Sequence, residues 1–97
     1  GFQFVYEAIH PNLQLASISG GTDIMGCFVL GCPVLPVYAG EIQVRGLGMD
    51  VAILDDDGQK ISCQQGELCC LSPFISMPVG FWNDDDGQKY KAACHTC

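Results

Sequence analysis

The residues of this chain that are best suited to chemistry stand together, directly after an apolar run at residues 15–18. They are Ser19, Gly20, Gly21, Thr22 and Asp23. Glycine has no Cβ, so the backbone can turn sharply there and approach a ligand closely. The hydroxyl of Thr22 could hold a phosphate oxygen, and the carboxylate of Asp23 could hold a metal ion. All five are also ordinary turn residues, so a strand that runs into a plain turn is the alternative.

A second group of candidate residues is the cysteines, of which the chain has seven. An odd number leaves at least one outside any intramolecular disulfide scheme, and most of them are interpreted as small buried hydrophobic residues. Cys94 and Cys97 have a spacing found in zinc sites, and Cys27 and Cys32 form a looser pair. A simple chain tail at residues 94–97 is the alternative. A thiol redox pair is disfavoured, because redox Cys-x-x-Cys pairs stand at the start of a helix.

Acidic residues gather in two copies of the hexapeptide Asp-Asp-Asp-Gly-Gln-Lys, at residues 55–60 and 84–89. Three carboxylates before a glycine suggest a calcium loop. The calcium loop of an EF-hand, however, alternates its ligands and ends in a distant glutamate, which neither copy does. Two solvated turns are therefore favoured over calcium sites.

Bulk composition limits the classes of protein that the chain can represent. With 97 residues, of which 48% are hydrophobic and 15% charged, it is expected to form one small folded domain. The net charge of -7 repels nucleic-acid backbones, so a nucleic-acid partner is not expected. No apolar run approaches the ~20 residues that span a bilayer, and no signal peptide is apparent, so no membrane role and a cytosolic location are predicted.

The first quarter of the chain is predicted to be the end of an α/β unit, over residues 1–24. Apolar residues recur at helical spacing over residues 2–9, and Pro11 ends that helix. Residues 13–17 are predicted to form a short buried strand that leads into a turn at Gly20 and Gly21. Residues 25–40 contain several glycines and prolines and are predicted to be an irregular crossing segment with a brief strand at 27–30.

The remainder, residues 41–93, is predicted to be mainly β. Strands are expected at residues 41–45, 49–54, 60–63 and 67–71. The acidic sequence at 55–58 is a strong hairpin-turn signal, since Gly58 can adopt a positive φ. Short strands at this spacing are typical of a small distorted antiparallel barrel. The predicted fold class is thus mainly β, with a short N-terminal helix, an α/β remnant and a barrel-like subdomain.

Four elements in order resemble the adenylate-forming enzymes. Residues 19–24 are similar to their nucleotide-binding motif, most often written Tyr-Gly-x-Thr-Glu, and residues 37–51 follow at the expected distance. Residues 66–68 look like the family's Gly-Glu-Leu strand, and residues 77–83 resemble its Gly-Tyr-x-Asn element. Within the acyl-CoA synthetases, the sequence is most similar to the acetoacetyl-CoA synthetase group, over roughly residues 4–93.

This resemblance implies a specific chemistry, in which a carboxylic acid is joined to coenzyme A through an acyl-adenylate formed from ATP. It implies that Thr22 contacts a nucleotide phosphate and that Asp23 helps to hold magnesium. It also implies that Ser19, Gly20 and Gly21 line the adenine and acyl side of the pocket. Magnesium prefers hard oxygen ligands and neutralises charge on phosphates, which fits these residue types.

The family's phosphate loop, its ribose-binding aspartate and its catalytic lysine have no counterpart within these 97 residues. The chain is therefore expected to be an internal fragment without a complete catalytic site, inactive alone. Apolar residues that a larger sheet would cover are expected to drive formation of a homodimer. A stand-alone β-module that binds a partner or a metal ion is the alternative function.

Overall fold

The computed structural model describes residues 1–94 as five short strands and two short helices. The helix α1 spans Phe2–Ala8, and the helix α2 spans Gln88–Cys94. The strands are β1 (Ser19–Gly21), β2 (Gly26–Leu30), β3 (Val44–Arg45), β4 (Val51–Leu54) and β5 (Glu67–Cys70). The first three form one antiparallel sheet in the order β1-β2-β3, and β4 pairs with β5 in a second one. The mainly β prediction is confirmed at this level.

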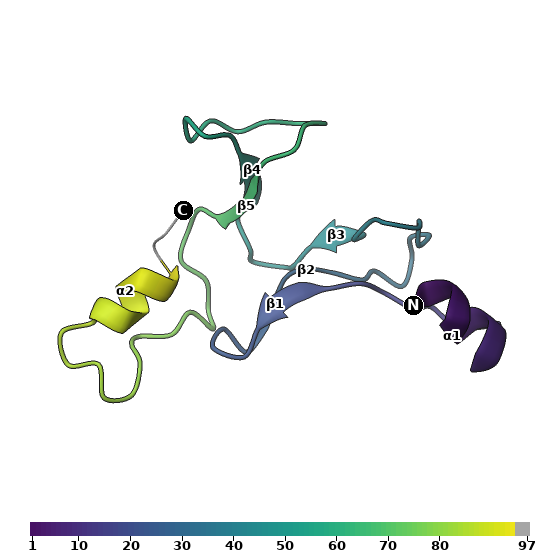
Figure 1. Cartoon of the computed structure of the whole chain (residues 1–97), viewed down its shortest axis with the longest axis horizontal. Helices are drawn as coiled ribbons and strands as arrows, with labels where there is room; N and C mark the ends of the chain where they lie inside the picture. Colours follow the sequence, from purple (N-terminus) through teal and green to yellow (C-terminus); the bar gives the residue numbers. More distant parts are fainter. Residues whose placement is uncertain (95–97) are drawn as a thin grey trace.

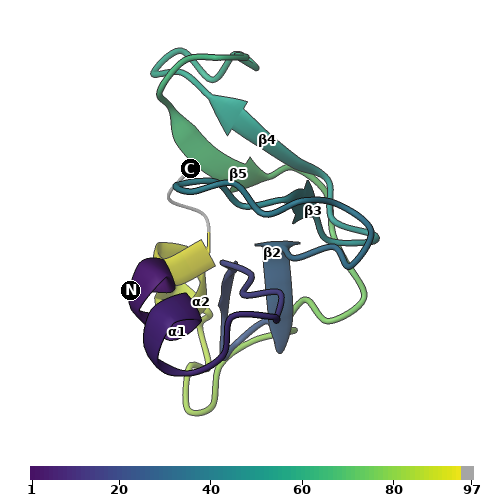
Figure 2. The same cartoon turned by 90° about the vertical axis from the view of Figure 1, so that its right-hand side faces the viewer.

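The molecule is elongated, with α1 and α2 at opposite ends and the sheet β1–β3 between them (Figure 1). The hairpin β4–β5 projects away from that sheet, as the view turned by 90° shows (Figure 2). The radius of gyration is 16.3 Å, whereas a compact domain of this length has about 12.5 Å. The accessible surface is 7716 Å², against about 5,400 Å² for a folded monomer of this mass. The chain therefore leaves much more surface uncovered than a compact domain does.

The buried core is small and consists of Ile24 (8% exposed), Val51 (6%) and Cys69 (5%). Val51 and Cys69 lie on the paired strands β4 and β5, whose register runs without interruption from Val51↔Cys70 to Leu54↔Glu67. Ile24 instead anchors the turn between β1 and β2. Phe28 of β2 and Phe74 add an edge-to-face ring contact, with centroids 5.8 Å apart.

The N-terminal helix forms where the apolar spacing predicts it, and it ends at Ala8, before Pro11. The predicted strand at residues 13–17 is wrong. This segment is irregular and partly buried, and the backbone N–H of Leu15 donates to the Tyr6 hydroxyl at 3.1 Å. Strand β1 begins two residues later and includes both glycines that were expected to form the turn. β1 pairs antiparallel with β2. The assignment of residues 1–24 to the end of an α/β unit stays a prediction.

The strands do not close into a barrel within residues 1–94, so that part of the prediction is not confirmed. The predicted strand at 41–45 is reduced to two residues, which pair with β2. The predicted strand at 60–63 contributes a single bridge, between Leu54 and Lys60. The brief strand at 27–30 and the strands at 49–54 and 67–71 are found with slightly different ends. No helix among the described residues is long and apolar enough to cross a membrane.

Candidate functional site

The candidate site is built on the hairpin β1–β2, which is irregular in its pairing. Ser19 pairs with Val29, whereas the next residue, Gly20, pairs with Cys27, so Phe28 is an extra residue in β2. Such a bulge bends the strand and changes the direction of neighbouring side chains. The backbones also approach closely here, since a Cβ at Gly20 would overlap the Gly26 carbonyl oxygen. Gly20 is thus required by the hairpin itself, whatever it does for a ligand.

The turn of this hairpin carries the hydroxyl and the carboxylate that the sequence singled out. Thr22 to Met25 form the turn, and the Met25 N–H donates to the Thr22 carbonyl oxygen at 3.2 Å. Burial of Ile24 fixes the turn, while Thr22 and Asp23 remain exposed. Met25 has a φ of 49°, in the left-handed region, which costs a non-glycine residue on the order of 1 kcal/mol.

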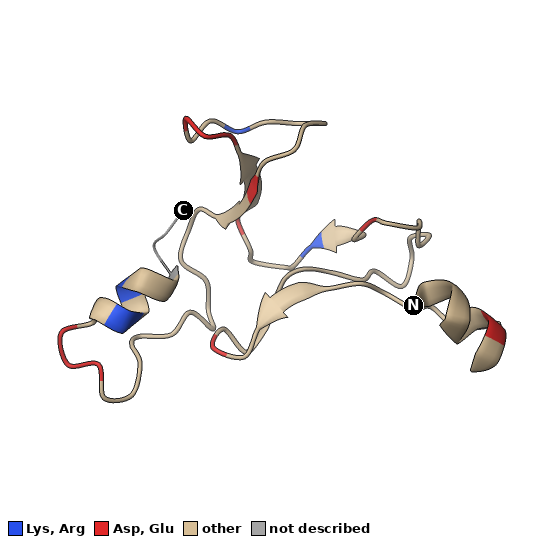
Figure 3. Ribbon diagram, viewed as in Figure 1, with Lys and Arg blue, Asp and Glu red and all other residues tan. Residues whose placement is uncertain are grey.

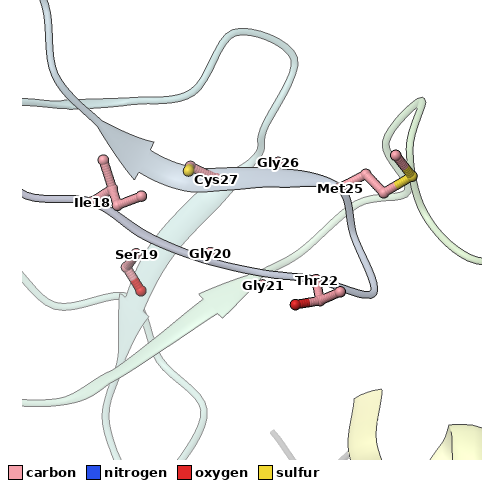
Figure 4. Close-up of a pocket in the computed structure, with 8 residues that line it drawn as sticks. All are labelled: Ile18, Ser19, Gly20, Gly21, Thr22, Met25, Gly26 and Cys27. Atoms are coloured by element: carbon pink, nitrogen blue, oxygen red, sulfur yellow. The ribbon is translucent and has the colours of Figure 1, made fainter.

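An open hollow lies against this hairpin. Residues 18–22 line it from the side of β1, and Met25, Gly26 and Cys27 line it from the side of β2. All four residues predicted to form the nucleotide and acyl pocket, Ser19, Gly20, Gly21 and Thr22, are therefore on its wall. In Figure 4, the hydroxyls of Ser19 and Thr22 lie on one side of β1, and the Ile18 and Cys27 side chains lie on the other. Asp23 is next to the hollow, in the turn, and is not part of its lining.

The lining of the hollow combines apolar side chains with hydroxyl groups, which suits an amphipathic ligand. Ile18 and Met25 are mostly exposed apolar side chains, with Met25 at 88%. Ser19 and Thr22 supply hydroxyls, and Gly21 leaves open space, since a Cβ there would meet no atom within 4 Å. Within residues 1–94, the side chains of Thr22 and Asp23 make no hydrogen bond, so their oxygens are available to a phosphate and a cation.

Asp23 is not part of a larger group of metal-binding side chains in this part of the chain. No group of three or more histidine, cysteine, aspartate or glutamate side chains converges among the described residues. One carboxylate fits the way magnesium is commonly held, with one or two protein carboxylates plus phosphate oxygens and waters. The zinc interpretation of residues 94–97 lies outside the described side chains. The aspartates of the two acidic hexapeptides occupy turns, whereas Glu7 lies in α1 and Glu67 in β5 (Figure 3, red).

Motif-based reasoning missed Ile18, Met25, Gly26 and Cys27 as lining residues. The last three fell in the segment that was interpreted as irregular and crossing, so the hairpin that brings them opposite Ser19 and Gly20 was not anticipated. A signal was nevertheless present, because the apolar run at 27–30 comes after the glycines at a distance suited to a hairpin turn.

Comparison with known proteins gives close matches over nearly all of this chain. It is 60% identical over 93 residues to acetoacetyl-coenzyme A synthetase of Rhizobium meliloti, covering 96% of this chain and 14% of that protein. It is 46% identical over 92 residues to acetoacetyl-CoA synthetase of Xenopus tropicalis, covering 95% of this chain and 14% of that protein. No protein-family model matches.

A solved structure, acetoacetyl-CoA synthetase from Streptomyces lividans, has the same fold over this segment. The two structures superpose with a TM-score of 0.76 at 42% sequence identity, and the match covers 94% of this chain and 14% of the Streptomyces lividans chain. By fold and sequence, the chain is therefore related to acyl-CoA synthetases. More narrowly, it is a homologue of acetoacetyl-CoA synthetases and corresponds to about 14% of their length.

Proposed function

We propose that this chain supplies the nucleotide-phosphate and magnesium motif of an enzyme that joins acetoacetate to coenzyme A at the expense of ATP. The observation that carries the proposal is the match to acetoacetyl-CoA synthetases, at up to 60% identity, over nearly the whole chain. The exposed hydroxyl and carboxylate at one end of an open hollow support it, because the chemistry needs oxygen groups beside a place for a planar base.

Each residue of the motif has a proposed role. The Thr22 hydroxyl donates a hydrogen bond to a nucleotide phosphate oxygen, and the Asp23 carboxylate is a magnesium ligand. Magnesium, when bound, would neutralise negative charge on the phosphates and so favour attack of the acetoacetate carboxylate on the α-phosphorus, with pyrophosphate as the leaving group. Ser19, Gly20 and Gly21 form the wall beside the adenine and the acyl group. A low wall of glycines lets a flat or short group lie close to the backbone.

The proposed reaction has two steps in the complete enzyme. Acetoacetate first displaces pyrophosphate from ATP to give acetoacetyl-adenylate, and the thiol of coenzyme A then displaces AMP. This chain contains one wall of the site at which these steps would occur. We therefore expect no turnover from the 97 residues alone, because groups that hold the remaining phosphates and the ribose are needed to position the nucleotide.

We also propose that the rest of such an enzyme completes the predicted barrel. In the described residues, β4 pairs with β5 and with the single bridge at Lys60, so the sheet has open edges. Open edges and large exposed side chains such as Phe4, Leu47 and Trp82 favour self-association when the chain is produced by itself. We expect a homodimer by sedimentation, and a monomer at high concentration would contradict this expectation.

The proposal is tested by two measurements of coenzyme A-dependent AMP release from ATP and acetoacetate. The 97-residue chain is assayed alone, and it is assayed again as a chimera in which it replaces the matched segment of the Rhizobium meliloti relative. We expect no turnover from the chain alone and clear turnover from the chimera. Turnover by the chain alone would overturn the fragment interpretation, and an inactive but folded chimera would overturn the proposed role of the segment.

A further inference from the structure

The hairpin that carries the candidate site has a weakly determined register. All five residues of β2 are partly buried, with no alternation between an inner and an outer face. Register is normally fixed by such alternation, since a slip of one residue turns every side chain to the other face. On its other side, β2 pairs with only two residues of β3, as Val29↔Arg45 and Leu30↔Val44. Something else must hold β2 in place.

The Gln43 side chain lies where the ladder between β2 and β3 would otherwise continue. By the same register, Cys32 would face Ile42, and the two backbones would exchange hydrogen bonds. Instead, the Cys32 N–H donates to Gln43 Oε1 at 3.0 Å, and Gln43 Nε2 donates back to the Cys32 carbonyl at 3.0 Å. The primary amide thus pairs with Cys32 as a backbone peptide group would.

The same amide also ties down the segment that comes after β2. Gln43 Nε2 lies 2.8 Å from the Leu35 carbonyl oxygen and 3.2 Å from that of Pro36. Gln14 Nε2 reaches the carbonyls of Cys32 and Leu35 from the other direction, at 2.8 and 3.1 Å. Exchange of the Gln43 amide nitrogen and oxygen would place an acceptor against these acceptors, so the amide orientation is fixed.

We infer that Gln43 is a positioning residue for the proposed ligase site, because its side-chain amide pins β2 in register and thereby places Gly26 and Cys27 on the wall of the hollow. The inference rests on the proposed function. Gln43 itself touches no part of the hollow at β1–β2. Its donor function is what matters, since its nitrogen faces at least two carbonyl oxygens while its oxygen accepts a single N–H.

This assignment can be tested by a change that removes the donor reversibly. In Gln43→Glu, the carboxylate can still accept the Cys32 N–H but cannot donate to the carbonyls. Facing carbonyl oxygens raises the pKa of that carboxyl in the folded state, because the charged form is disfavoured. A raised folded-state pKa gives stability that is present at low pH and lost as the pH rises through that pKa.

The experiment uses the chimera with three variants, Gln43→Glu, Gln43→Leu and Gln14→Leu, and measures kcat/KM from about pH 5.5 to about pH 8.5. We expect Gln43→Leu to lose about tenfold at every pH, relative to the unsubstituted chimera. We expect Gln43→Glu to show that loss at high pH and to recover toward the unsubstituted value as the pH falls. Gln14→Leu is expected to lose less, because Gln43 still holds both carbonyls.

Other groups near Gln43 are controlled in the same series. Gln43 lines a second hollow, separate from the one at β1–β2, together with Glu41 and Tyr38. Cys32, whose backbone is hydrogen-bonded to the Gln43 amide, adds a thiol nearby. Gln43→Glu is therefore repeated with Glu41→Gln, and all values are taken as ratios to the unsubstituted chimera. A pH-independent ratio for Gln43→Glu, or unchanged activity in Gln43→Leu, would overturn the inference.

Hydrogen exchange of residues 26–36 gives a readout that does not depend on activity. Protection of this stretch should show the same pH pattern in Gln43→Glu and be lost in Gln43→Leu, while β4–β5 keeps its protection. This separates the two proposals. The positioning role fails if the exchange is unaffected, whereas the proposed function fails if changes at Asp23 leave magnesium-dependent turnover intact.

Discussion

The two hairpins of this chain, β1–β2 and β4–β5, differ in the regularity of their pairing and in how their turns use polar side chains. The hairpin β4–β5 pairs four residues with four in an uninterrupted register and buries Val51 and Cys69. The hairpin β1–β2 has a bulge in its pairing. Both hairpins have a glycine at a close approach, Gly20 and Gly66. Both also hold a non-glycine residue at a positive φ between their strands, Met25 and Cys63. Irregular pairing is common next to functional sites, where a bulge changes the direction of a side chain.

We propose that the two hairpins have different roles, in which β4–β5 contributes stability and β1–β2 presents groups to a ligand. β4–β5 places its polar residues in a turn that satisfies itself, with the Asp55 carboxylate accepting from the N–H groups of Asp57 and Gln59. The turn of β1–β2 leaves the Thr22 and Asp23 side chains exposed, with their oxygens available. Substitutions made in the chimera, in one hairpin or the other, test this contrast.

The largest effect on the hairpin is expected from Gly20→Ala. The new Cβ would overlap the Gly26 carbonyl oxygen and lie 2.7 Å from Cys27 Cα, so the hairpin must shift. Overpacking of this kind costs about 3 kcal/mol. Hydrogen exchange should show loss of protection over residues 26–30, together with loss of AMP release. Gly21→Ala is the matched control, because its Cβ meets nothing within 4 Å; equal protection in the two variants would contradict this account.

The next effect is expected from Thr22→Val, which keeps the shape of the side chain and removes its hydroxyl. A hydrogen bond to a charged group is worth about 2 kcal/mol, which corresponds to a loss of roughly 30-fold in kcat/KM. Thr22→Ser keeps the hydroxyl and should retain most of the activity. If Val and Ser variants are equally active, the hydroxyl does not contact a phosphate.

A smaller effect, on stability alone, is expected from Val51→Ala in the other hairpin. The substitution removes two methyl carbons from a residue that is 6% exposed. It should lower the free energy of unfolding by about 1.6 kcal/mol. Thermal unfolding should show the loss, while kcat/KM below the transition stays unchanged. Leu47→Ala is the control, since Leu47 is fully exposed and its truncation should leave stability as it is. Lost activity in folded Val51→Ala would mean that β4–β5 also shapes the site.

The smallest effects are expected from Asp55→Ala and Asp84→Ala, at the first position of each acidic hexapeptide. Asp84 accepts from the N–H groups of Lys89 and Tyr90 at 3.1 and 2.8 Å and so caps α2. Loss of the hydrogen bonds that either carboxylate accepts should reduce local stability by about 1 kcal/mol. Hydrogen exchange of the neighbouring amides measures this reduction as lower protection. Asp56→Ala and Asp85→Ala, at the second position of each hexapeptide, are the controls. Larger effects in these two variants would contradict the stabilising role given to Asp55 and Asp84.

These two hexapeptides show how far sequence could predict the fold. Both form the same tight turn, with the glycine N–H donating to the first aspartate carbonyl at 3.0 and 2.9 Å and glycine φ values of 76° and 69°. The turn was predictable because its residues act locally. The segments after the two turns differ, since the first copy returns along β4 and the second starts a helix. Helix propensity could have separated them, because residues 90–93 favour a helix more than residues 61–63 do.

The candidate site was predictable only in part, for a related physical reason. The residue types at 19–23 singled out this stretch as a candidate site, and the structure places Ser19, Gly20, Gly21 and Thr22 on the wall of one hollow. The strand at 13–17 and the turn at Gly20 and Gly21 were wrong, because both glycines lie in β1, where Gly20 permits the close approach of the paired strands. The opposite wall comes from Met25, Gly26 and Cys27, and its position depends on a bulge that no local pattern specifies.

The central claim, that Asp23 holds magnesium at a nucleotide phosphate, is tested most directly by the magnesium dependence of AMP release in the chimera. Asp23→Ala should lower turnover by about 100-fold and raise the magnesium concentration needed for half the maximal rate, since metal charge stabilisation is worth several kcal/mol. Asp23→Glu should retain much of the activity, because it keeps a carboxylate. Asp57→Ala, which removes an exposed turn carboxylate of the other hairpin, is the control. Equal magnesium dependence in Asp23→Ala and Asp57→Ala would contradict the claim.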